Sequence, residues 1–225
     1  MELVDTFFNW DVLVRAFPML LRGVWNTILL GSASIVFGGV AGILICLARL
    51  YAPRPVRLLA IVYIDVLRAM PILVLLILIY YALPFVGIRF SSFTSATLAL
   101  SMVLAAFTAE VCRAGIESIP KGQFEASAAL GLPFWSAMRK VILPQALQVV
   151  IPPLTSNCVS IYKDTALASV VAMPDLLKQA TDAQALMANP TPLIGAALIY
   201  LAFLWPLVRL VNHLEERGKA AMITR

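Results

Sequence analysis

The chain has 225 residues, of which 61% are apolar and 13% are charged, and its mean hydropathy is +0.92. Soluble domains are roughly 45–50% apolar and about 25% charged, so this composition excludes a soluble domain and indicates an integral membrane protein. The net charge of +5 comes without a basic run or a patch of interleaved basic and aromatic residues, which argues against a nucleic-acid partner.

The aromatic residues Phe7, Phe8 and Trp10 predict an interfacial segment over residues 1–19, on the outer face of a membrane. Apolar segments follow, each long enough for a membrane helix, which needs about 20 largely apolar residues. Proline-containing breaks separate these five segments, which are Leu20–Leu47, Leu58–Leu83, Thr94–Cys112, Pro152–Met173 and Leu193–Leu214. The sequence therefore predicts an all-α integral membrane protein with five transmembrane helices in a single domain, residues 1–225.

The first apolar segment contains many small residues, among them Gly38 and Gly42, which form a GxxxG pair. In lipid this pattern lets two helix backbones approach closely. We therefore interpret these glycines as packing residues.

Lys and Arg residues gather mostly on one side of the predicted membrane helices, around residues 49–57, 113–140 and 209–225. Cytoplasmic loops carry the excess of these residues in membrane proteins. The distribution predicts an N-terminus outside, a C-terminus in the cytoplasm, and a cytoplasmic loop over residues 113–147, between the third and fourth helices.

The longest polar interruption is the stretch Glu125–Pro144 inside this loop. Mostly good helix formers fill its first six positions, and Gly131 followed by Pro133 should end that helix. A second short helix is predicted over Trp135–Val141, ending before Pro144. Helices this short cannot span a bilayer, so we expect them to lie on the membrane surface and to offer a contact to a partner.

The same stretch resembles the EAA motif of permease subunits from ATP-binding cassette (ABC) importers. The matching residues are Glu125-Ala126-Ser127, Gly131 and Val141-Ile142-Leu143-Pro144, and flanking matches are Ile119–Gln123, Leu143–Ala146, Ala109-Glu110 with Arg113, and Lys163–Leu167. These flanking residues resemble those of the permeases of the polar amino-acid uptake family. The transmembrane domain of this family is similar to that of methionine importers. Departures from the family pattern are Ser127 for the second Ala, Ala69-Met70 for Gly-Thr after Arg68, and Ala166 for Ser.

No P-loop pattern, GxxxxGK[ST], occurs in the chain, so it cannot bind and split ATP by that route. The resemblance implies that separate ABC ATPase subunits hold the ATP and Mg²⁺, and that this chain is not an enzyme and holds no cofactor or metal. It further implies a second permease subunit, identical or closely related, an external or periplasmic solute-binding protein, and a place in the bacterial inner membrane. The residues implied to couple to the ATPase are Glu125, Ala126, Ser127, Gly131, Leu132 and Phe134.

Several charged residues interrupt the apolar segments, namely Asp65, Arg68, Glu110, Lys163 and Asp164. A charge at the centre of a membrane helix costs about 2.5–3.5 kcal/mol on insertion scales, so such residues usually face a partner or a wet pathway. Asp65 with Arg68, and Glu110 with Arg113, are spaced i, i+3 and can neutralise each other on one helix face. Self-neutralisation and a functional role both remain open for these pairs.

Lys163 and Asp164 are adjacent and cannot pair across one helix. An unwound helix at Thr165 would free backbone groups near the midplane, as in transporters with discontinuous helices. Asp164 could then accept the ammonium of an amino acid, while Lys163, Thr165 or free amides could receive its carboxylate. The alternative is that Lys163 and Asp164 only fix this helix to its neighbours. The candidate substrate residues are Asn157, Lys163, Asp164, Thr165, Ala166, Glu110 and Arg68.

The sequence thus predicts an ABC-importer permease subunit that moves a polar amino acid or a derivative by alternating access. Alternatives are an ion-driven secondary transporter, a non-transporting membrane scaffold and a membrane-embedded enzyme. The enzyme has no support, because HExxH, GxSxG and a second histidine are all lacking.

Overall fold

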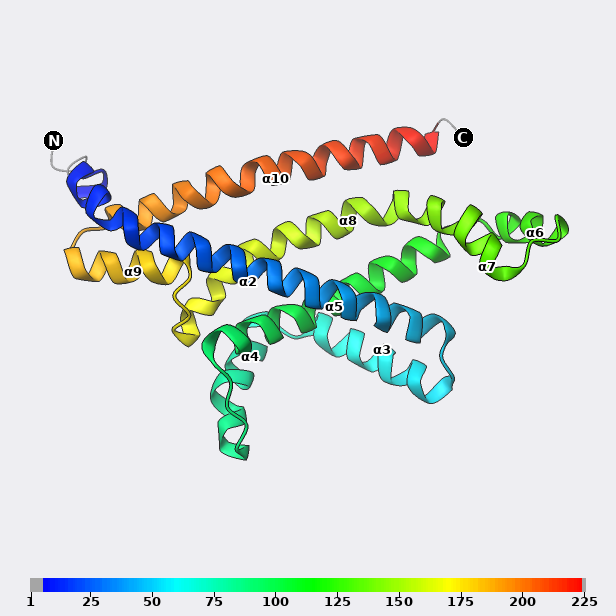
Figure 1. Ribbon diagram of the computed structural model, residues 1–225, viewed down its shortest axis with the longest axis horizontal. Coiled ribbons are helices and arrows are strands. Elements are labelled where there is room, and N and C mark those ends of the chain that lie inside the picture. The colour runs from blue at the N-terminus through cyan, green and yellow to red at the C-terminus, as the bar shows by residue number, and fades with distance from the viewer. Residues whose placement is uncertain (1–5, 224–225) are drawn as a thin grey trace.

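The computed structural model describes residues 6–223, and within that range the regular structure is entirely helical (Figure 1). The elements are α2 (Trp10–Tyr51), α3 (Arg54–Ala69), α4 (Ile72–Ile77), η1 (Leu78–Ala82), η2 (Leu83–Val86), α5 (Ser92–Glu117), α6 (Lys121–Ala129), α7 (Phe134–Ala137), η3 (Met138–Ile142), α8 (Leu143–Asp164), η4 (Thr165–Val171), α9 (Leu176–Met187) and α10 (Thr191–Ile223). The predicted all-α fold is confirmed. The outer segment predicted over residues 1–19 lies partly outside the described residues, and its described part from Trp10 is continuous with α2.

Three helices are long and apolar enough to cross a membrane, namely α2, α5 and the part of α10 from Thr191 to His213. Residues 54–86 make a fourth candidate only if α3 and the segment Ile72–Val86, which are bent by 105°, count as one span. The membrane helix predicted over Leu58–Leu83 is therefore not one continuous helix, because it is broken between Ala69 and Ile72. The predicted boundaries of the fourth segment are also wrong, because α8 begins at Leu143, ends at Asp164 and passes into the 3₁₀ turns of η4.

The sharp bend after α3 has a local cause in Pro71. Met70 has φ −88° and ψ 130°, and Pro71 has φ −61° and ψ 132°, so both residues are extended. Proline disfavours a helical conformation at the residue before it and has no N–H for the helical ladder. As a result, α4, η1 and η2 leave the body of the molecule as a projecting arm (Figure 1).

Helix α5 lies at the centre of the packing and is the most buried of the candidate spans. Gly38 and Gly42 of α2 lie against it: a Cβ at residue 38 would be 2.9 Å from the Ser101 carbonyl oxygen, and one at residue 42 would be 2.5 Å from Thr108 Cβ. The predicted role of the GxxxG pair in close packing is confirmed. This contact fixes α2 across the face of α5.

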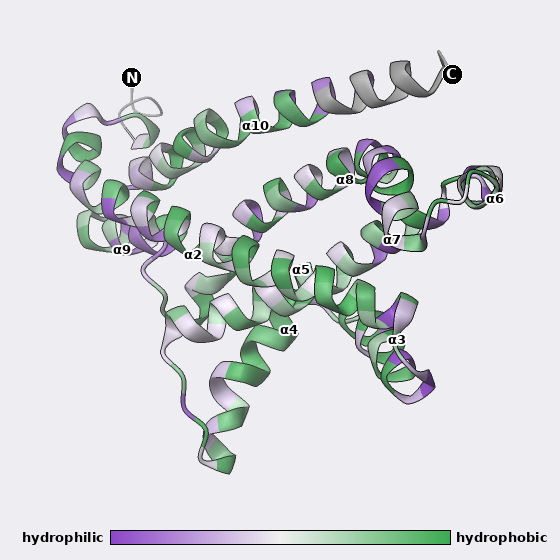
Figure 2. Ribbon diagram, turned by 45° about the vertical axis from the view of Figure 1, so that its right-hand side comes forward, coloured by the Kyte–Doolittle hydropathy of each residue, from purple (hydrophilic) through white to green (hydrophobic). Residues whose placement is uncertain are grey.

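The outward faces of the helices are strongly apolar, and the ribbon of α4 is mostly green, the colour of hydrophobic residues, in Figure 2. Large side chains such as Phe37, Leu59 and Leu201 are each more than 60% exposed. A soluble protein rarely exposes apolar surface on this scale. The distribution fits helices whose outer faces contact lipid or another membrane subunit.

Helices α7, η3 and α8 follow one another without a non-helical residue, from Phe134 to Asp164. The prediction that a short helix ends before Pro144 is wrong. The π turn of η3, in which the Leu143 N–H donates to the Met138 carbonyl, lies just before this proline. A wider turn at that point relieves the clash between the proline ring and the preceding turn.

Candidate functional site

The loop between α5 and α8 folds into two short helices around a glycine turn. At the end of α6, the Leu132 N–H donates to the Ser127 carbonyl at 3.1 Å and the Gly131 N–H donates to the Ala128 carbonyl at 2.9 Å. These two bonds form a Schellman motif, which places its glycine in the left-handed region, and Gly131 has φ +73°. The turn predicted at Gly131 is confirmed, although α6 begins earlier than expected, at Lys121.

This loop exposes part of the set predicted to couple to a partner. Glu125, Ala126 and Phe134 are exposed, and Leu132 is half-buried. Ser127, in contrast, is buried, and its hydroxyl donates to the Gln123 carbonyl at 2.7 Å. The loop therefore presents an acidic and apolar surface from α6 and α7, while the Ser127 side chain faces inward and bonds within α6 itself.

A cavity of about 410 Å³ lies where α3 ends and where α5 and α8 face each other. Its lining residues come from the α3–α4 break, α5 and α8, and they are Arg68, Met70, Pro71, Ile72, Val103, Leu104, Phe107, Asn157, Ser160, Ile161 and Asp164. The volume is in the range of ordinary small-molecule sites, and so is a lining that is mainly apolar with a few polar groups.

Three of the predicted substrate residues, Arg68, Asn157 and Asp164, line this cavity together. The amide Nδ2 of Asn157 is buried and has no hydrogen-bond partner among the described residues. Asp164 is half-buried and likewise forms no hydrogen bond or ion pair with any residue that the structure describes. Buried polar groups are normally hydrogen-bonded, so these two side chains have donor and acceptor capacity left for a bound molecule.

The remaining members of the predicted set do not line this cavity. Lys163 is exposed on α8. Thr165 is fully buried at the start of η4, where its hydroxyl donates to the Tyr162 carbonyl at 2.7 Å, and Ala166 follows it within η4. The helix does not unwind at Thr165: the α-helix ends at Asp164 and the 3₁₀ turns of η4 follow it directly.

Ser160 and Phe107 line the cavity but were absent from the predicted set. Ser160 follows Asn157 by three residues and precedes Asp164 by four, a spacing that places all three on one helix face. This periodicity is visible in the sequence and would have identified Ser160. The position of Phe107 depends on how α5 packs against α3, for which the sequence carries no local signal.

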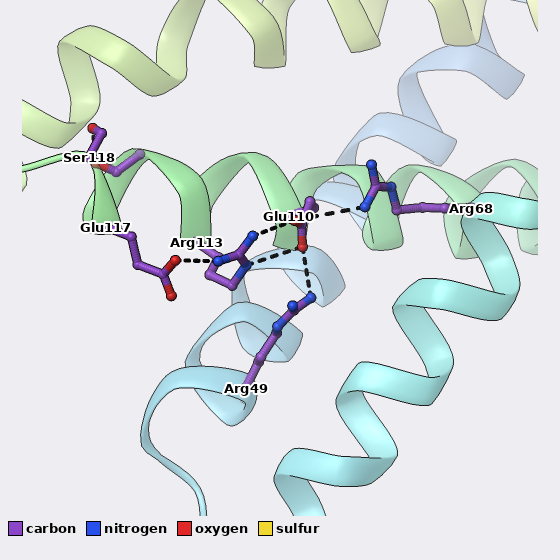
Figure 3. Close-up of polar contacts among 7 residues, drawn as sticks. Arg49, Arg68, Glu110, Arg113, Glu117 and Ser118 are labelled. Atoms are coloured by element: carbon purple, nitrogen blue, oxygen red, sulfur yellow. Dashed lines mark hydrogen bonds and ion pairs between the residues drawn. The ribbon is translucent and has the colours of Figure 1, made fainter.

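Glu110 lies at the centre of a charged cluster beside the cavity, and Figure 3 shows arginines from three helices pointing toward it. Its Oε2 lies 2.7 Å from Arg49 Nη1, and its Oε1 lies 2.5 Å from Arg113 Nη2 and 3.8 Å from Arg68 Nη1. Arg113 also pairs with Glu117. The predicted pair of Glu110 with Arg113 is confirmed.

Of the two alternatives left open for Asp65 and Arg68, their mutual neutralisation does not occur in the structure. Asp65 is exposed and forms no ion pair or hydrogen bond within the described part of the chain. The guanidinium of Arg68 turns instead toward Glu110 and lies over the ring of Phe107, 5.6 Å from its centroid. A cation over an aromatic face is attracted by the ring, so contacts with α5 determine where Arg68 points.

A mainly apolar helical domain with an amphipathic cavity between its helices, and with a structured surface loop, has the features of a membrane transport component. The chain belongs to the family of binding-protein-dependent transport system inner membrane components, whose model matches residues 16–219. Membership of this family makes it a component of transport rather than an enzyme.

Relatives and solved structures agree with this assignment. The chain is 38% identical over 78% of its length to the probable amino-acid ABC transporter permease protein YckA of Bacillus subtilis, covering 78% of that protein. It is 37% identical over 95% of its length to the L-cystine transport system permease protein TcyB of the same organism, covering 92% of it.

A crystal structure of an amino acid ABC transporter with histidines matches with a TM-score of 0.87 and 33% identity, over 93% of this chain and 98% of that one. The MetNI methionine ABC transporter in an inward-facing conformation shares the fold, with a TM-score of 0.71 and 22% identity, over 89% of this chain and 96% of that one.

Proposed function

We propose that this chain is the permease subunit of an ABC importer that carries a polar amino acid or a derivative across the bacterial inner membrane. The observation that carries the proposal is the cavity at the α3–α4 break. It brings a guanidinium from Arg68, a carboxylate from Asp164 and an unpartnered amide from Asn157 to one space of about 410 Å³. An amino acid presents a carboxylate and an ammonium, and this pair of charges is complementary to Arg68 and Asp164.

The polar groups have distinct roles in this proposal. Arg68 receives the α-carboxylate, because a guanidinium donates bidentately to a carboxylate. Asn157 donates its Nδ2 to the same carboxylate or to a polar side chain, and Asp164 accepts from the α-ammonium. The apolar wall from α5 and α4 surrounds the ligand and excludes water, which strengthens the charged contacts.

The energy for transport comes, in this proposal, from ABC ATPase subunits that contact the loop 113–147. Glu125 and the aromatic Phe134 are exposed there, and aromatic anchors commonly dominate interfaces. The ring of Phe134 also lies 6.2 Å from the ring of Tyr51, at the end of α2. The loop therefore touches α2, the helix that packs along α5, and an ATPase that moves the loop can act on α2 through this contact. A second permease subunit and a solute-binding protein complete the proposed assembly.

Reconstitution of the complex tests the proposed function. The permease, with its ATPase and solute-binding protein, is placed in proteoliposomes and offered labelled L-cystine, L-glutamine and L-arginine. We expect ATP-dependent uptake of at least one of them, and no uptake when the ATPase is omitted. Uptake without the ATPase would identify an ion-driven carrier, and hydrolysis that no amino acid and no binding protein stimulates would identify a non-transporting scaffold.

The proposed topology, with the N-terminus outside, the C-terminus in the cytoplasm and five passages of the membrane, has its own test. Single cysteines introduced by Gly122→Cys in α6 and Arg89→Cys after η2, in a chain whose native cysteines are replaced by serine, are labelled with a membrane-impermeant thiol reagent. We expect labelling at residue 89 in intact spheroplasts and at residue 122 only in inside-out vesicles. The reverse pattern would overturn the orientation but leave the transport class intact.

A further inference from the structure

Arg68 lies between Glu110 and the cavity, where the carboxylate of a ligand could bind. Its side chain lines the cavity, yet Nη1 also lies 3.8 Å from Glu110 Oε1. That distance is within the range of an ion pair but beyond that of a hydrogen bond. The side chain remains 40% exposed. The contact with Glu110 is therefore a loose electrostatic attraction, which a better acceptor can replace.

Glu110 does not depend on Arg68, because two other arginines already occupy both of its oxygens. Oε2 accepts from Arg49 Nη1 at 2.7 Å and from Arg113 Nε at 3.2 Å, while Oε1 accepts from Arg113 Nη2 at 2.5 Å. Arg113 binds through two nitrogens, the strong bidentate geometry of an arginine–carboxylate pair. Loss of Arg68 from the cluster would thus leave Glu110 fully paired.

The cluster around Glu110 holds three arginines against two glutamates, Glu110 and Glu117, so one cation has no carboxylate of its own. The geometry identifies it as Arg68, since Arg49 and Arg113 make the short bonds (Figure 3). Asp164, the carboxylate that lines the cavity, forms no ion pair with Arg68 or with any other described residue. An anion that enters the cavity therefore meets a guanidinium with spare capacity.

Arg68 also has a location that allows it to reorient. It lies in the last turn of α3, two residues before the extended pair Met70 and Pro71. The side chain is held by Phe107 and Glu110 rather than by a hydrogen bond to another described side chain. A rotamer change there needs no broken hydrogen bond.

We propose that Arg68 exchanges partners, from Glu110 in the empty protein to the α-carboxylate of the bound amino acid. Glu110 is then a positioning residue. It keeps the guanidinium of Arg68 beside the cavity, and the ligand carboxylate must attract Arg68 more strongly than Glu110 does before the side chain turns to the ligand. This inference rests on the proposed function, because it takes the ligand to be an amino acid. Its consequence is that Glu110 weakens binding of a ligand carboxylate and leaves binding of an analogue that lacks the carboxylate unchanged.

The test compares an amino acid with its α-carboxamide, which lacks the anionic group. The probe is whichever of L-cystine, L-glutamine and L-arginine the wild-type complex takes up, and its affinity for the purified complex in nanodiscs is measured without the solute-binding protein. We expect Glu110→Gln to tighten binding of the amino acid by about two- to fivefold, the range of an exposed ion pair, and to leave carboxamide binding unchanged. Combined with Arg68→Gln, the effect of Glu110→Gln should vanish.

Matched variants separate this exchange from a general change in charge or stability. Glu117→Gln makes the same substitution in the same cluster, but Glu117 contacts Arg113 and not Arg68, so amino-acid affinity should stay at the wild-type level. If Glu110→Gln does not assemble, Glu110→Asp keeps a negative charge for Arg49 and Arg113 while it withdraws the carboxylate from Arg68, and the same direction of change is expected.

Two results would overturn the proposed exchange: unchanged amino-acid affinity in both Glu110 variants, or a gain in affinity that persists when Arg68 is replaced. Either result leaves the transport function standing, since uptake by the wild-type complex is measured separately. Failure of that uptake with every amino acid offered would instead count against the proposed function itself.

Discussion

The ring of Tyr162 in α8 lies directly against Gly31 of α2. A Cβ at residue 31 would be 2.5 Å from the ring carbons Cδ1 and Cε1, and the Tyr162 hydroxyl lies 2.9 Å from that of Ser32. On its other side the ring meets Phe203 of α10 edge-on, with centroids 5.2 Å apart. Tyr162 thus holds the end of α8, and with it Asp164, between two neighbouring helices.

Gly31→Ala should therefore destabilise the protein and disturb the cavity. The added methyl group cannot fit unless Tyr162 moves, and overpacking of this kind costs about 1–3 kcal/mol. We expect a lower thermal unfolding midpoint in detergent and reduced uptake. Gly39→Ala is the control in the same helix, because a Cβ there meets nothing within 4 Å. Equal midpoints for the two variants would show that Tyr162 is not locked in place.

Asn157→Leu should separate stability from ligand binding. The amide Nδ2 is buried without a partner among the described residues, so its replacement by an apolar group of similar size removes an unpaired donor and should leave stability equal or higher. Binding should weaken by about tenfold or more, the value of a hydrogen bond to a charged group. Thermal unfolding and equilibrium binding are measured in parallel, with Asn212→Leu on the exposed face of α10 as the control. Weaker binding together with lower stability would indicate a structural role instead.

Asp175 should make stability depend on pH. It is fully buried at the N-cap of α9, where its Oδ1 accepts from the Lys178 N–H at 2.9 Å and its Oδ2 has no partner among the described residues. Burial raises the pKa of this carboxyl from 3.8 to about 6. Between these two pH values the folded state binds more protons than the unfolded state, so stability falls as pH rises through this window. The loss is complete above about pH 6 and amounts to about 3 kcal/mol.

Asp175→Asn removes the ionisation but keeps a side chain that caps helices well. We expect its thermal midpoint to exceed that of the wild type at pH 7.5 and the difference to shrink toward pH 4. Asp182→Asn, at a half-buried position of the same helix where the carboxylate pairs with Lys178, should not show this trend. A wild-type midpoint that rises between pH 4 and pH 6 relative to Asp175→Asn would contradict the assignment.

Gly131→Ala should impair coupling through backbone strain alone. A Cβ at residue 131 meets open space, but φ is +73°, a region that costs a non-glycine residue about 1–2 kcal/mol. We expect fewer amino acids taken up per ATP hydrolysed in the reconstituted complex. Gly131→Asn should be milder, since asparagine tolerates this region. Gly122→Ala, which is also in open space but lies within α6, should match the wild type, and a loss equal to that of Gly131→Ala would rule out strain as the cause.

Local signals in the sequence were sufficient for several elements. Gly131 ends α6 because a glycine is needed at a left-handed position, and Gly38 and Gly42 pack because they lack side chains. The sequence could not distinguish the prolines, however. Pro71 breaks a helix, whereas α8 runs through Pro152 and Pro153. Whether a helix continues past proline depends on how neighbouring helices support the freed backbone groups, and that information lies in tertiary contacts.

In the candidate site, too, some residues could be predicted from local spacing, whereas other contacts depend on how the helices pack. Asn157 and Asp164 were predictable because both lie on one helix, seven residues apart, and so share a face. Arg68 belongs to the predicted substrate set and does line the cavity, but the spacing also allowed a pair with Asp65, whereas its real neighbours, Phe107 and Glu110, come from α5. An i, i+3 pair contributes only a few tenths of a kcal/mol. Contacts between helices can therefore override it.

The unbroken course of α7, η3 and α8 has a mechanical consequence. From Phe134 at the surface loop to Asp164 at the cavity, 31 helical residues follow one another, a length of about 46 Å at 1.5 Å per residue. Such a continuous helical run can transmit a displacement along its length. Between its two ends it approaches α5 closely, since a Cβ at Gly115 would lie 2.0 Å from a methyl carbon of Val150, and this point can serve as the pivot. A small tilt imposed at one end must then appear, in the opposite direction, at the other.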